Sequence, residues 1–471
     1  MSKLCCTHIA DYKKLKGIDV YSKIHANYIT CIKQSARTQK IRECFCHICK
    51  TRSHRLHACL ECSFVGCFDR EHIQAHADLN KHSIAIDVTF GNVYCFSCKD
   101  YMYDIELNLS KRYSGLWQPG ESDTTLINAC ESGRIVRSKF LGLRGLVNLG
   151  QTCYMNCIVQ VLTHNPLLRN YFLSDKHNIY TCQFNCDRQT CLACEMSALF
   201  QEFYSGQQVP HIPYKLVYII WKHAKHLDGY DPQDAHEFFI TMLDVLHEHS
   251  KNPKEDDSSC QCIIHKIYTG RLQSDILCMH CKNVRTKIEE FRDIGLDLGT
   301  DDGSGKSSIS LKDCLERYTQ PEMLHSSCDS CQQYGLSKKQ LTVQKLPVVI
   351  SFHLKRLEFG KKITTYVKFP EYLNMTPFVS SIRGTSSRTN EESSFSNSPY
   401  NSSDNNFCLF AVVNHTGNKE GGHYISFIKM KQKWYKCDDD MITNATVNDV
   451  LVSEGYLLFY HKEVVDYNKK D

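Results

Sequence analysis

The chain has 471 residues, of which 42% are hydrophobic and 23% charged, and its formal net charge is +4. This composition is typical of a globular protein with two or three domains and a sizeable core. The small net charge gives no support to a dedicated nucleic-acid binder, which carries a clustered basic face. No stretch approaches about 18 consecutive apolar residues, and the N-terminus lacks an apolar segment, so we expect neither a membrane span nor a signal peptide.

Cysteine and histidine are unusually frequent, with 27 and 23 residues. Without a signal peptide, this composition favours metal binding or catalysis over a disulfide framework. Six Cys-x-x-Cys pairs support zinc, because two residues between thiolates allow a tight turn to direct both sulfurs at one tetrahedral ion. The pairs begin at Cys46, Cys59, Cys95, Cys191, Cys278 and Cys328.

Residues 1–105 are predicted to form a small domain that is held together by zinc more than by a large core. Twelve plausible ligands, enough for three tetrahedral sites, occur here: Cys6, His8, Cys46, Cys49, Cys59, Cys62, Cys67, His72, His76, His82, Cys95 and Cys98. Any of five residues left over could replace an assigned ligand: Cys5, Cys44, His47, His54 and His57. Residues 106–140 are predicted to form a connector.

A larger domain is predicted over residues 141–463, with helices first and strands second. Apolar residues at helical spacing follow Cys153, and a second amphipathic helix is predicted over 232–248. The second half contains segments typical of strands, at 263–272, 341–354, 407–413, 423–430 and 456–460. An α+β fold follows. A Ser- and Asn-rich insertion at 380–406 has almost no large apolar residues, and we expect it to be disordered.

Cys153 is predicted to lie at the start of its helix. Thr152 before it is a good N-cap residue, and a helix N-terminus favours the thiolate, the reactive form of cysteine. Asn148, across a glycine-containing turn, could place its amide beside the Cys153 N–H group, so that both donors hold an oxyanion. A purely structural cysteine is the alternative at this point.

The second half of the domain favours catalysis. Two glycines precede His423 and would allow a substrate backbone to approach the imidazole. A short predicted strand then ends in three carboxylates, Asp438–Asp440. The order Cys, His, Asp is that of papain-like proteases, which use a thiolate, an imidazole base and an orienting group. A zinc peptidase is not indicated, because His236-Glu237 is followed by Ile240 where a His-Glu-x-x-His motif needs histidine.

Four motifs in this order resemble the ubiquitin-specific protease family, and the match runs from about residue 142 to 460. They are the Gly-Gln-Thr-Cys-Tyr-Met-Asn stretch around Cys153 and the segments 230–238, 353–357 and 421–424. The resemblance implies a papain-like cysteine protease with a thumb, a palm and zinc-bearing fingers. Such an enzyme hydrolyses the isopeptide bond between the ubiquitin C-terminus and a substrate lysine. The segment 230–238 would form one wall of the channel for the ubiquitin tail.

The same resemblance assigns a role to each residue of the catalytic set. Cys153 is the nucleophile, His423 the general base, and Asn148 contributes to the oxyanion hole. Asp439 orients the imidazole, although either neighbour could replace it, because Asp438–Asp440 lie in a row.

Resemblance and spacing together group the ligands into six sites. The N-terminal segment resembles the zinc-finger domain of several ubiquitin proteases, whose pattern gives the sets Cys6/His8/Cys95/Cys98, Cys46/Cys49/Cys67/His72 and Cys59/Cys62/His76/His82. In the larger domain the sets are Cys278/Cys281/Cys328/Cys331, His177/Cys182/Cys191/Cys194 and His247/Cys260/Cys262/His265. Cys186 is a rival to Cys182, and His247 could instead be a solvent-facing helix residue. We expect about six structural zinc ions, three in each domain.

The architecture as a whole resembles the branch of the family that removes ubiquitin from histone H2B within the SAGA coactivator complex. This implies a nuclear enzyme that regulates transcription and assembles with small adaptor subunits of the SAGA deubiquitinating module. The alternatives are a different ubiquitin conjugate, a zinc-rich scaffold with a weak protease domain, and a zinc-finger nucleic-acid binder. We expect no direct sequence-specific contact with nucleic acid.

Overall fold

The computed structural model of the chain covers both predicted domains in part. It describes residues 6–16, 45–52, 55–62, 64–88, 93–102, 142–174, 176–177, 182, 191–204, 209–227, 232–252, 260–299, 308–358, 361–380, 405–418 and 421–463. The predicted connector and nearly all of the predicted insertion lie outside these residues. No helix among the described residues is long and apolar enough to cross a membrane.

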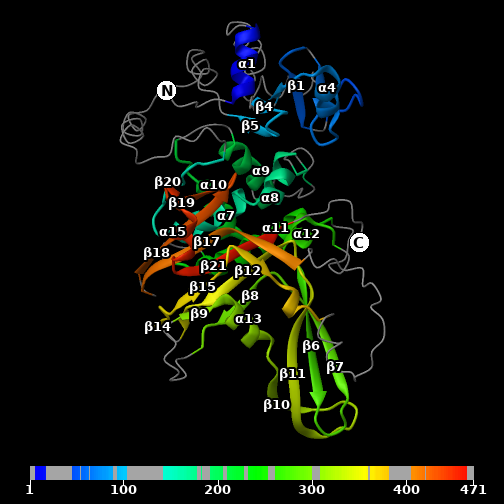
Figure 1. The fold of residues 1–471 in the computed structure, drawn as a ribbon, viewed down its shortest axis with the longest axis vertical. Coiled ribbons are helices and arrows are strands. Elements are labelled where there is room, and N and C mark those ends of the chain that lie inside the picture. The colour runs from blue at the N-terminus through cyan, green and yellow to red at the C-terminus, as the bar shows by residue number, and fades with distance from the viewer. Residues whose placement is uncertain are drawn as a thin grey trace. The chain divides into compact units, whose positions relative to one another are not determined.

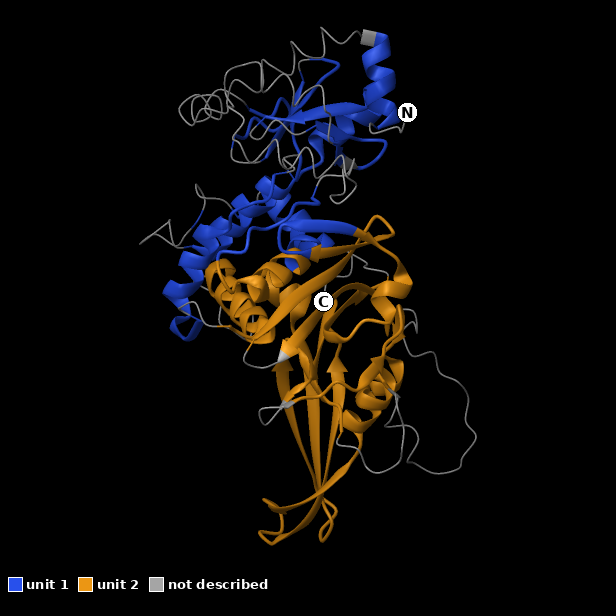
Figure 2. Cartoon of the chain, turned by 90° about the vertical axis from the view of Figure 1, so that its left-hand side faces the viewer, with its two compact units in different colours: residues 1–149, 162–228, 438–443 blue, residues 150–161, 229–437, 444–471 orange. Residues whose placement is uncertain are grey.

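The chain divides into two compact units, coloured separately in Figure 2. Unit 1 comprises residues 1–149, 162–228 and 438–443, and unit 2 comprises 150–161, 229–437 and 444–471. Figure 1 labels the helices and strands of both units.

An antiparallel sheet of five short strands forms the N-terminal part of unit 1. Its order is β2 (Val65–Cys67), β1 (Leu56–Cys59), β3 (Ile84–Asp87), β4 (Val93–Cys95) and β5 (Asp100–Met102). Two helices accompany the sheet, α1 (Thr7–Lys16) and α4 (His72–Asn80). Ile9 of α1 is buried in the core, and the Tyr12 hydroxyl donates to the carbonyl of Leu60 at 2.6 Å. Helix α1 is therefore an integral part of this small core.

Helices make up the second part of unit 1. They are α8 (Pro166–Leu173), α9 (Leu192–Phe203), α10 (Tyr214–His223) and the 3-10 turn η2 (Lys225–Leu227). The pair Asn165-Pro166 starts α8, because the Asn165 side chain accepts from the first backbone amides and proline fits the first helical position. The rings of Phe172 and Phe200 stack between α8 and α9 with centroids 5.0 Å apart.

A large sheet dominates unit 2. Within this unit its order is β19 (Lys433–Asp438), β18 (Gly421–Met430), β17 (Asn406–Asn418), β21 (Gly455–Lys462), β12 (Val349–Lys355) and β8 (Ile294–Asp297), and β16 (Tyr372–Asn374) pairs with β17. Most of the short strand β20 (Met441–Ala445) belongs to unit 1. The β12–β8 pair is parallel. The helices with residues in this unit are α7 (Cys153–Thr163), α11 (Ala235–Ser250), α12 (Ile263–Tyr268), α13 (Leu311–Thr319) and α15 (Val447–Leu451). Short elements complete it: β9 (Ser308–Ser310), β13 (Leu357–Glu358), β14 (Lys361–Lys362), β15 (Tyr366–Lys368) and η4 (Thr376–Phe378).

A second, four-stranded antiparallel sheet extends from the same unit (Figure 1). Its order is β10 (Glu322–Ser327), β11 (Tyr334–Lys345), β6 (Gly270–Cys278) and β7 (Val284–Phe291). The turns that connect β6 to β7 and β10 to β11 carry two of the Cys-x-x-Cys pairs. This arrangement corresponds to the zinc-bearing fingers that the sequence predicts, and the α+β fold class is confirmed.

Two of the predicted strands need correction. The segment 263–272 begins as helix α12, and β6 starts only at Gly270. The Cys262 sulfur caps this helix by accepting from the backbone amide of His265 at 3.4 Å, which a pattern rich in isoleucine does not reveal. The segment 341–354 contains two strands, interrupted near Pro347, which has no N–H group for a sheet.

Candidate active site and zinc centres

Cys153 is the first residue of α7, as the sequence predicts. Gly150 and Gln151 have φ angles of 100° and 56°, so a left-handed turn leads into the helix. The carbonyl of Thr152 accepts from the amides of Met155 and Asn156 at 3.1 and 3.0 Å and closes the first helical turn. Cys153 itself is 6% exposed. A helix N-terminus at a thiol stabilises the thiolate.

His423 lies near the start of β18, paired with Thr416 of β17. The two preceding glycines differ in their surroundings. A Cβ on Gly421 would meet nothing within 4 Å, whereas one on Gly422 would lie 1.9 Å from Nε2 of His415. Gly421 therefore leaves the space for a substrate that the sequence predicts, and Gly422 is required for a different reason, the close packing of His415.

Tyr424 connects the strand of His423 with two other parts of unit 2. Burial raises the pKa of its phenol, and the charges of Asp234 and Cys153 act in the same direction. A hydrogen bond from the backbone amide of Ala235 to this phenol opposes them. Cys153 and the first turn of α11 therefore both lie close to the residue that follows His423.

Asp439 follows β19, the strand that pairs with β18. Its φ angle is 51°, and its carbonyl accepts from the amide of Leu146 at 2.8 Å. Its carboxylate accepts from the side-chain amide of Asn148 at 2.9 Å. Gly145 packs against the Asp440 backbone so closely that a Cβ would lie 2.1 Å from the Asp440 carbonyl oxygen. Asp439 of this carboxylate row therefore has a direct link to Asn148.

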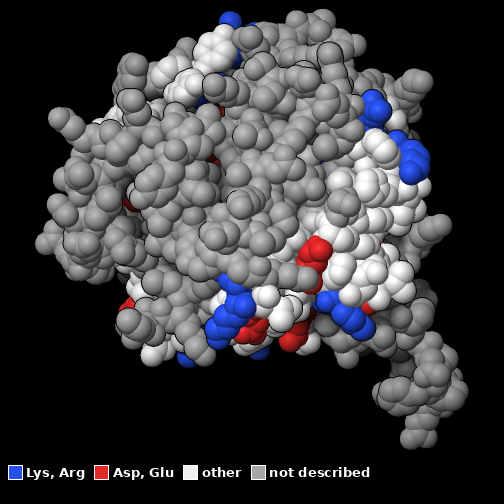
Figure 3. Space-filling model, turned by 90° about the horizontal axis from the view of Figure 1, so that it is seen from above, with Lys and Arg blue, Asp and Glu red and all other residues white. Residues whose placement is uncertain are grey.

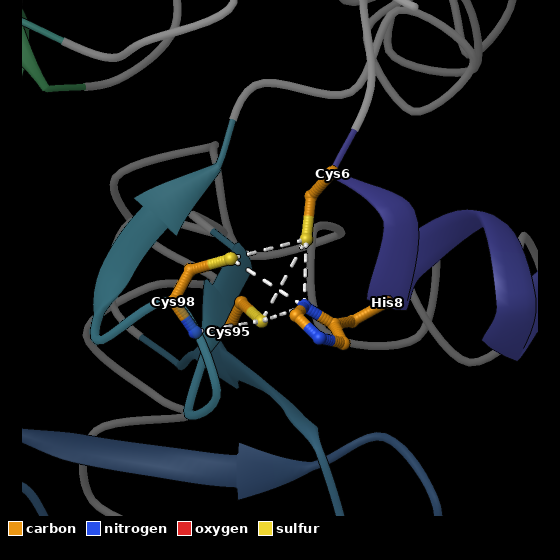
Figure 4. A group of neighbouring side chains, drawn as sticks. All are labelled: Cys6, His8, Cys95 and Cys98. Atoms are coloured by element: carbon orange, nitrogen blue, oxygen red, sulfur yellow. Dashed lines mark hydrogen bonds between the residues drawn. The ribbon is translucent and has the colours of Figure 1, made fainter.

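Three Cys/His groups lie around the five-stranded sheet, as the sequence predicts. In the first, the Cys6 sulfur lies 3.5 Å from Nδ1 of His8 and 3.7 and 3.5 Å from the sulfurs of Cys95 and Cys98. Figure 4 shows the four side chains pointing into one space from the start of α1 and from the β4–β5 turn. Sulfurs bound at about 2.3 Å to a tetrahedral zinc lie about 3.8 Å apart, so these residues fit the ion.

The other two groups of this domain have similar spacing. The sulfurs of Cys49 and Cys67 are 3.4 Å apart, and Cys46 lies 3.3 Å from Nδ1 of His72. The remaining group is Cys59, Cys62, His76 and His82, with sulfur–nitrogen distances of 3.2 to 3.7 Å. Both sets fit tetrahedral zinc on the same grounds.

The left-over residues that the structure describes have other contacts. Nδ1 of His47 accepts from the Val65 amide at 3.4 Å. His57 is fully buried, with Nε2 2.7 Å from the Tyr101 hydroxyl, and burial lowers its pKa to about 3. The candidates Cys5, Cys44 and His54 lie outside the described residues.

Two predicted groups lie beside helices of the larger domain. His177, Cys182, Cys191 and Cys194 come together, with Nε2 of His177 3.5 and 3.3 Å from the last two sulfurs. The rival Cys186 lies outside the described residues.

The second group is His247, Cys260, Cys262 and His265. His247 is buried, so the solvent-facing alternative is wrong. Its Nδ1 lies 3.2 Å from the Cys262 sulfur, and Nε2 of His265 lies 3.3 Å from the Glu290 carboxylate. In histidines that bind zinc, the ring nitrogen that does not bind the metal typically contacts a carboxylate or another acceptor.

The finger cysteines form the sixth group. The Cys278 and Cys331 sulfurs are 3.9 Å apart, and those of Cys281 and Cys328 are 3.6 Å apart. Backbone N–H groups of Cys331 and Ser330 lower the pKa of the Cys328 thiol to about 6. The backbone of this turn therefore favours the Cys328 thiolate, the form that binds zinc.

Known protein families match both parts of the chain. The pattern described as "Ubiquitin carboxyl-terminal hydrolase" matches residues 144–460, and the "Zn-finger in ubiquitin-hydrolases and other protein" pattern matches residues 46–107. This chain belongs to the ubiquitin carboxyl-terminal hydrolase family. It is a thiol-dependent ubiquitin hydrolase with a zinc-binding domain ahead of its catalytic domain.

Individual members of the family match over nearly their whole length. Ubiquitin carboxyl-terminal hydrolase 22 of Homo sapiens is 45% identical over 98% of this chain and 96% of that protein. The hydrolase nonstop of Drosophila melanogaster is 40% identical over 99% of this chain and 100% of that protein. Among solved structures, the SAGA Ubp8/Sgf11/Sus1/Sgf73 DUB module bound to ubiquitin aldehyde aligns with a TM-score of 0.56 and 28% identity, covering 99% of this chain and 100% of the matched chain.

Proposed function

We propose that this hydrolase removes ubiquitin from histone H2B in the nucleus, as the catalytic subunit of a SAGA-type deubiquitinating module. The observation that carries the proposal is a likeness over the whole chain, zinc-finger domain included, to the matched chain of that module. A likeness confined to the catalytic domain would support ubiquitin hydrolysis without favouring any particular assembly. In this assignment, small adaptor subunits like those of the solved module are the partners.

The positions described above support the catalytic roles that the sequence suggests. We assign Cys153 as the nucleophile, His423 as the base and Asp439 as the group that orients the imidazole. The support for Asp439 is its fixed backbone and its hydrogen bond with Asn148. We assign Asn148 two functions, to hold the Asp439 carboxylate and to contribute its second N–H donor to the oxyanion hole.

The reaction then proceeds by acyl transfer. His423 takes the proton of Cys153, and the thiolate attacks the carbonyl carbon of the terminal glycine of ubiquitin. The amides of Cys153 and Asn148 stabilise the tetrahedral oxyanion. His423 then protonates the leaving lysine amine, which leaves ubiquitin bound as a thioester. Water attacks the thioester with His423 again as base and releases the ubiquitin carboxylate and the Cys153 thiol.

Zinc in this enzyme has a structural function. We assign one ion to each of the six groups, three in residues 1–105 and three in residues 141–463. Each group offers four ligands, which leaves no open position for a substrate or a reactive water. The ions therefore hold the fold in place and take no part in the bond cleavage.

A nucleic-acid binder is the less favoured assignment. Figure 3 shows lysine and arginine together with aspartate and glutamate on the face in view, and the described residues there form no continuous basic patch.

For the zinc-finger domain we favour docking to a protein partner. Capture of a free ubiquitin tail would need a donor for its terminal carboxylate, and positions 68 and 69 provide none. Phe68 stacks on His57 with ring centroids 4.5 Å apart, and Asp69 is an acidic side chain that is only 5% exposed.

The test uses the tagged full-length chain purified from its own cells together with whatever co-elutes. We expect small adaptor proteins to co-elute and the complex to release ubiquitin both from ubiquitin–rhodamine and from nucleosomes ubiquitinated on H2B. The Cys153→Ala variant is the control and should be inactive with its partners retained. Cleavage of ubiquitin–rhodamine without H2B cleavage would mean that the conjugate is a different one. Inactivity on both substrates would leave the scaffold alternative.

A further inference from the structure

Two histidines of unit 2 form a stacked pair beside the start of α11. The rings of His236 and His353 lie 3.9 Å apart between centroids, with an interplanar angle of 19°. Each ring has a polar partner at its edge. Nε2 of His236 lies 2.8 Å from the Asp293 carboxylate, and Nε2 of His353 lies 3.1 Å from the Tyr456 hydroxyl. The pair therefore connects α11, β12, β21 and the turn between β7 and β8.

The hydrogen bonds on the His353 side run in one direction. The Tyr456 hydroxyl lies 2.7 Å from both carboxylate oxygens of Asp234, so its single proton is donated there. Tyr456 is completely buried, and burial raises its pKa, which keeps the phenol protonated. The phenol oxygen must then accept its second hydrogen bond from Nε2–H of His353. Burial lowers the pKa of His353 to about 4, which keeps its ring neutral.

The chain of hydrogen bonds ends at Asp234, and the backbone amide of the residue after it contacts the residue next to the base. Asp234 is the N-cap of α11 and accepts from the His236 amide at 2.8 Å. The next residue, Ala235, gives its backbone amide to the phenol of Tyr424, which follows His423. Asp234 is half-buried, so part of its surface remains available to a ligand. His353 is thus linked through Tyr456 and Asp234 to the region near the base.

We propose that His353 is a positioning residue: through Tyr456 it fixes Asp234 and the first turn of α11, and thereby sets the affinity for the ubiquitin tail. The inference rests on the function proposed above. Since Ala235 and Cys153 both lie close to Tyr424, a ubiquitin tail that reaches Cys153 passes near this turn. Loss of the His353 hydrogen bond leaves the nucleophile and the base intact. It therefore weakens ubiquitin binding and leaves the rate of bond cleavage nearly unchanged.

The first test separates KM from kcat for ubiquitin–rhodamine with the full-length chain. His353→Phe keeps a stacked ring and removes the donor, so KM should rise about fivefold, the equivalent of one hydrogen bond, with kcat within about twofold. His353→Gln can place a side-chain N–H near the former Nε2 and should restore most of the affinity. His461→Phe is the matched control, because His461 lies on β21 and its nearest ring is Phe410, outside this chain of hydrogen bonds.

A second test asks whether His353 acts through Tyr456. Tyr456→Phe should raise KM by a similar factor, and adding His353→Phe to it should change little, since both substitutions break the same chain. Titration of ubiquitin into the same variants on a Cys153→Ala background should give matching changes in Kd. Should His353→Phe fail to fold, Tyr456→Phe alone carries the test.

Either of two results overturns the inference: KM unchanged in both single variants, or a fall in kcat at constant KM. Additive effects in the double variant would show that His353 does not act through Tyr456. A wild-type chain that does not cleave ubiquitin–rhodamine would refute the proposed function itself, which is a different outcome.

Discussion

The five-stranded sheet of the zinc-finger domain and the large sheet of the catalytic domain are stabilised in different ways. In the first, the predicted zinc ligands Cys46, Cys67 and Cys95 are themselves part of the buried core. In the second, the core consists of large apolar side chains such as Phe352, Leu458 and Tyr460, and it includes none of the predicted ligands. The comparison indicates that metal replaces apolar packing where the domain is small, and that the catalytic sheet needs no metal for its own core.

Removal of zinc should have the largest effect, and it should differ between the two sheets. Each structural zinc contributes on the order of 10 kcal/mol to folding, more than a small core supplies. With a chelator, or in Cys95→Ser, we expect hydrogen exchange of β1 to β5 to lose its protection while β12, β17 and β21 keep theirs. Cys408→Ser is the control, since Cys408 lies outside the six groups. Elemental analysis must first show that the zinc is gone. If the strands of both sheets then keep the same protection, the comparison is contradicted.

A core truncation should show the opposite pattern. Phe352 is completely buried in β12, and Phe352→Ala removes a ring from the catalytic core at a cost of about 3 to 5 kcal/mol. The midpoint of urea unfolding, followed by the fluorescence of the buried Trp434, should fall at saturating zinc, with the zinc content unchanged. Val452→Ala, at a position 68% exposed, should shift the midpoint little. An equal shift in both variants would mean that the signal does not report this core.

Much of the fold could be predicted because its signals are local. The helix at Cys153, the helix near residue 235 and the six ligand groups each follow from spacing within a few residues or from a known motif. The stacking of His236 on His353 depends on how α11 packs against β12, two elements far apart in the sequence. The packing of His415 on Gly422 depends on the register of β17 and β18. Periodicity reveals neither the tertiary packing nor the register. Helix α12 has no such local signal, because a cysteine, and not a usual capping residue, starts it.

Single replacements of the three aspartates 438–440 should show which of them is the catalytic carboxylate. Asp439→Ala should lower kcat on the order of 100-fold or more, because the imidazole loses its orienting partner. Asp438→Ala and Asp440→Ala should stay within a few-fold of wild type, as matched controls that remove the same charge. Zinc content and urea midpoint should be unchanged in all three variants. Equal losses at the three positions would show that the assignment does not follow from the hydrogen bond with Asn148.

The smallest predicted effect is a dependence of the catalytic core on pH. Burial holds the pKa of His353 at about 4 in the folded chain, against about 6.5 in the unfolded chain. Since unfolding then takes up a proton, His353 contributes full stability above pH 6.5, and this contribution is lost as the pH falls towards 4.

For this single group the linkage amounts to about 2 kcal/mol between pH 7 and pH 5. Acid also protonates zinc ligands, so the stability of the catalytic sheet must be measured separately from that of the zinc sites. Hydrogen exchange of β12 and β21, corrected for the intrinsic exchange rate at each pH, gives this stability. In His353→Gln, which has no titrating ring, the loss of protection between pH 7 and pH 5 should be smaller by that amount. His461→Phe, on the same strand β21 but outside the hydrogen-bond chain, should retain the wild-type slope. Identical slopes in wild type and His353→Gln would mean that the His353 ring binds its proton equally well in the folded and the unfolded chain. The catalytic core, like the zinc-finger domain, would then owe its sensitivity to acid to its metal ligands.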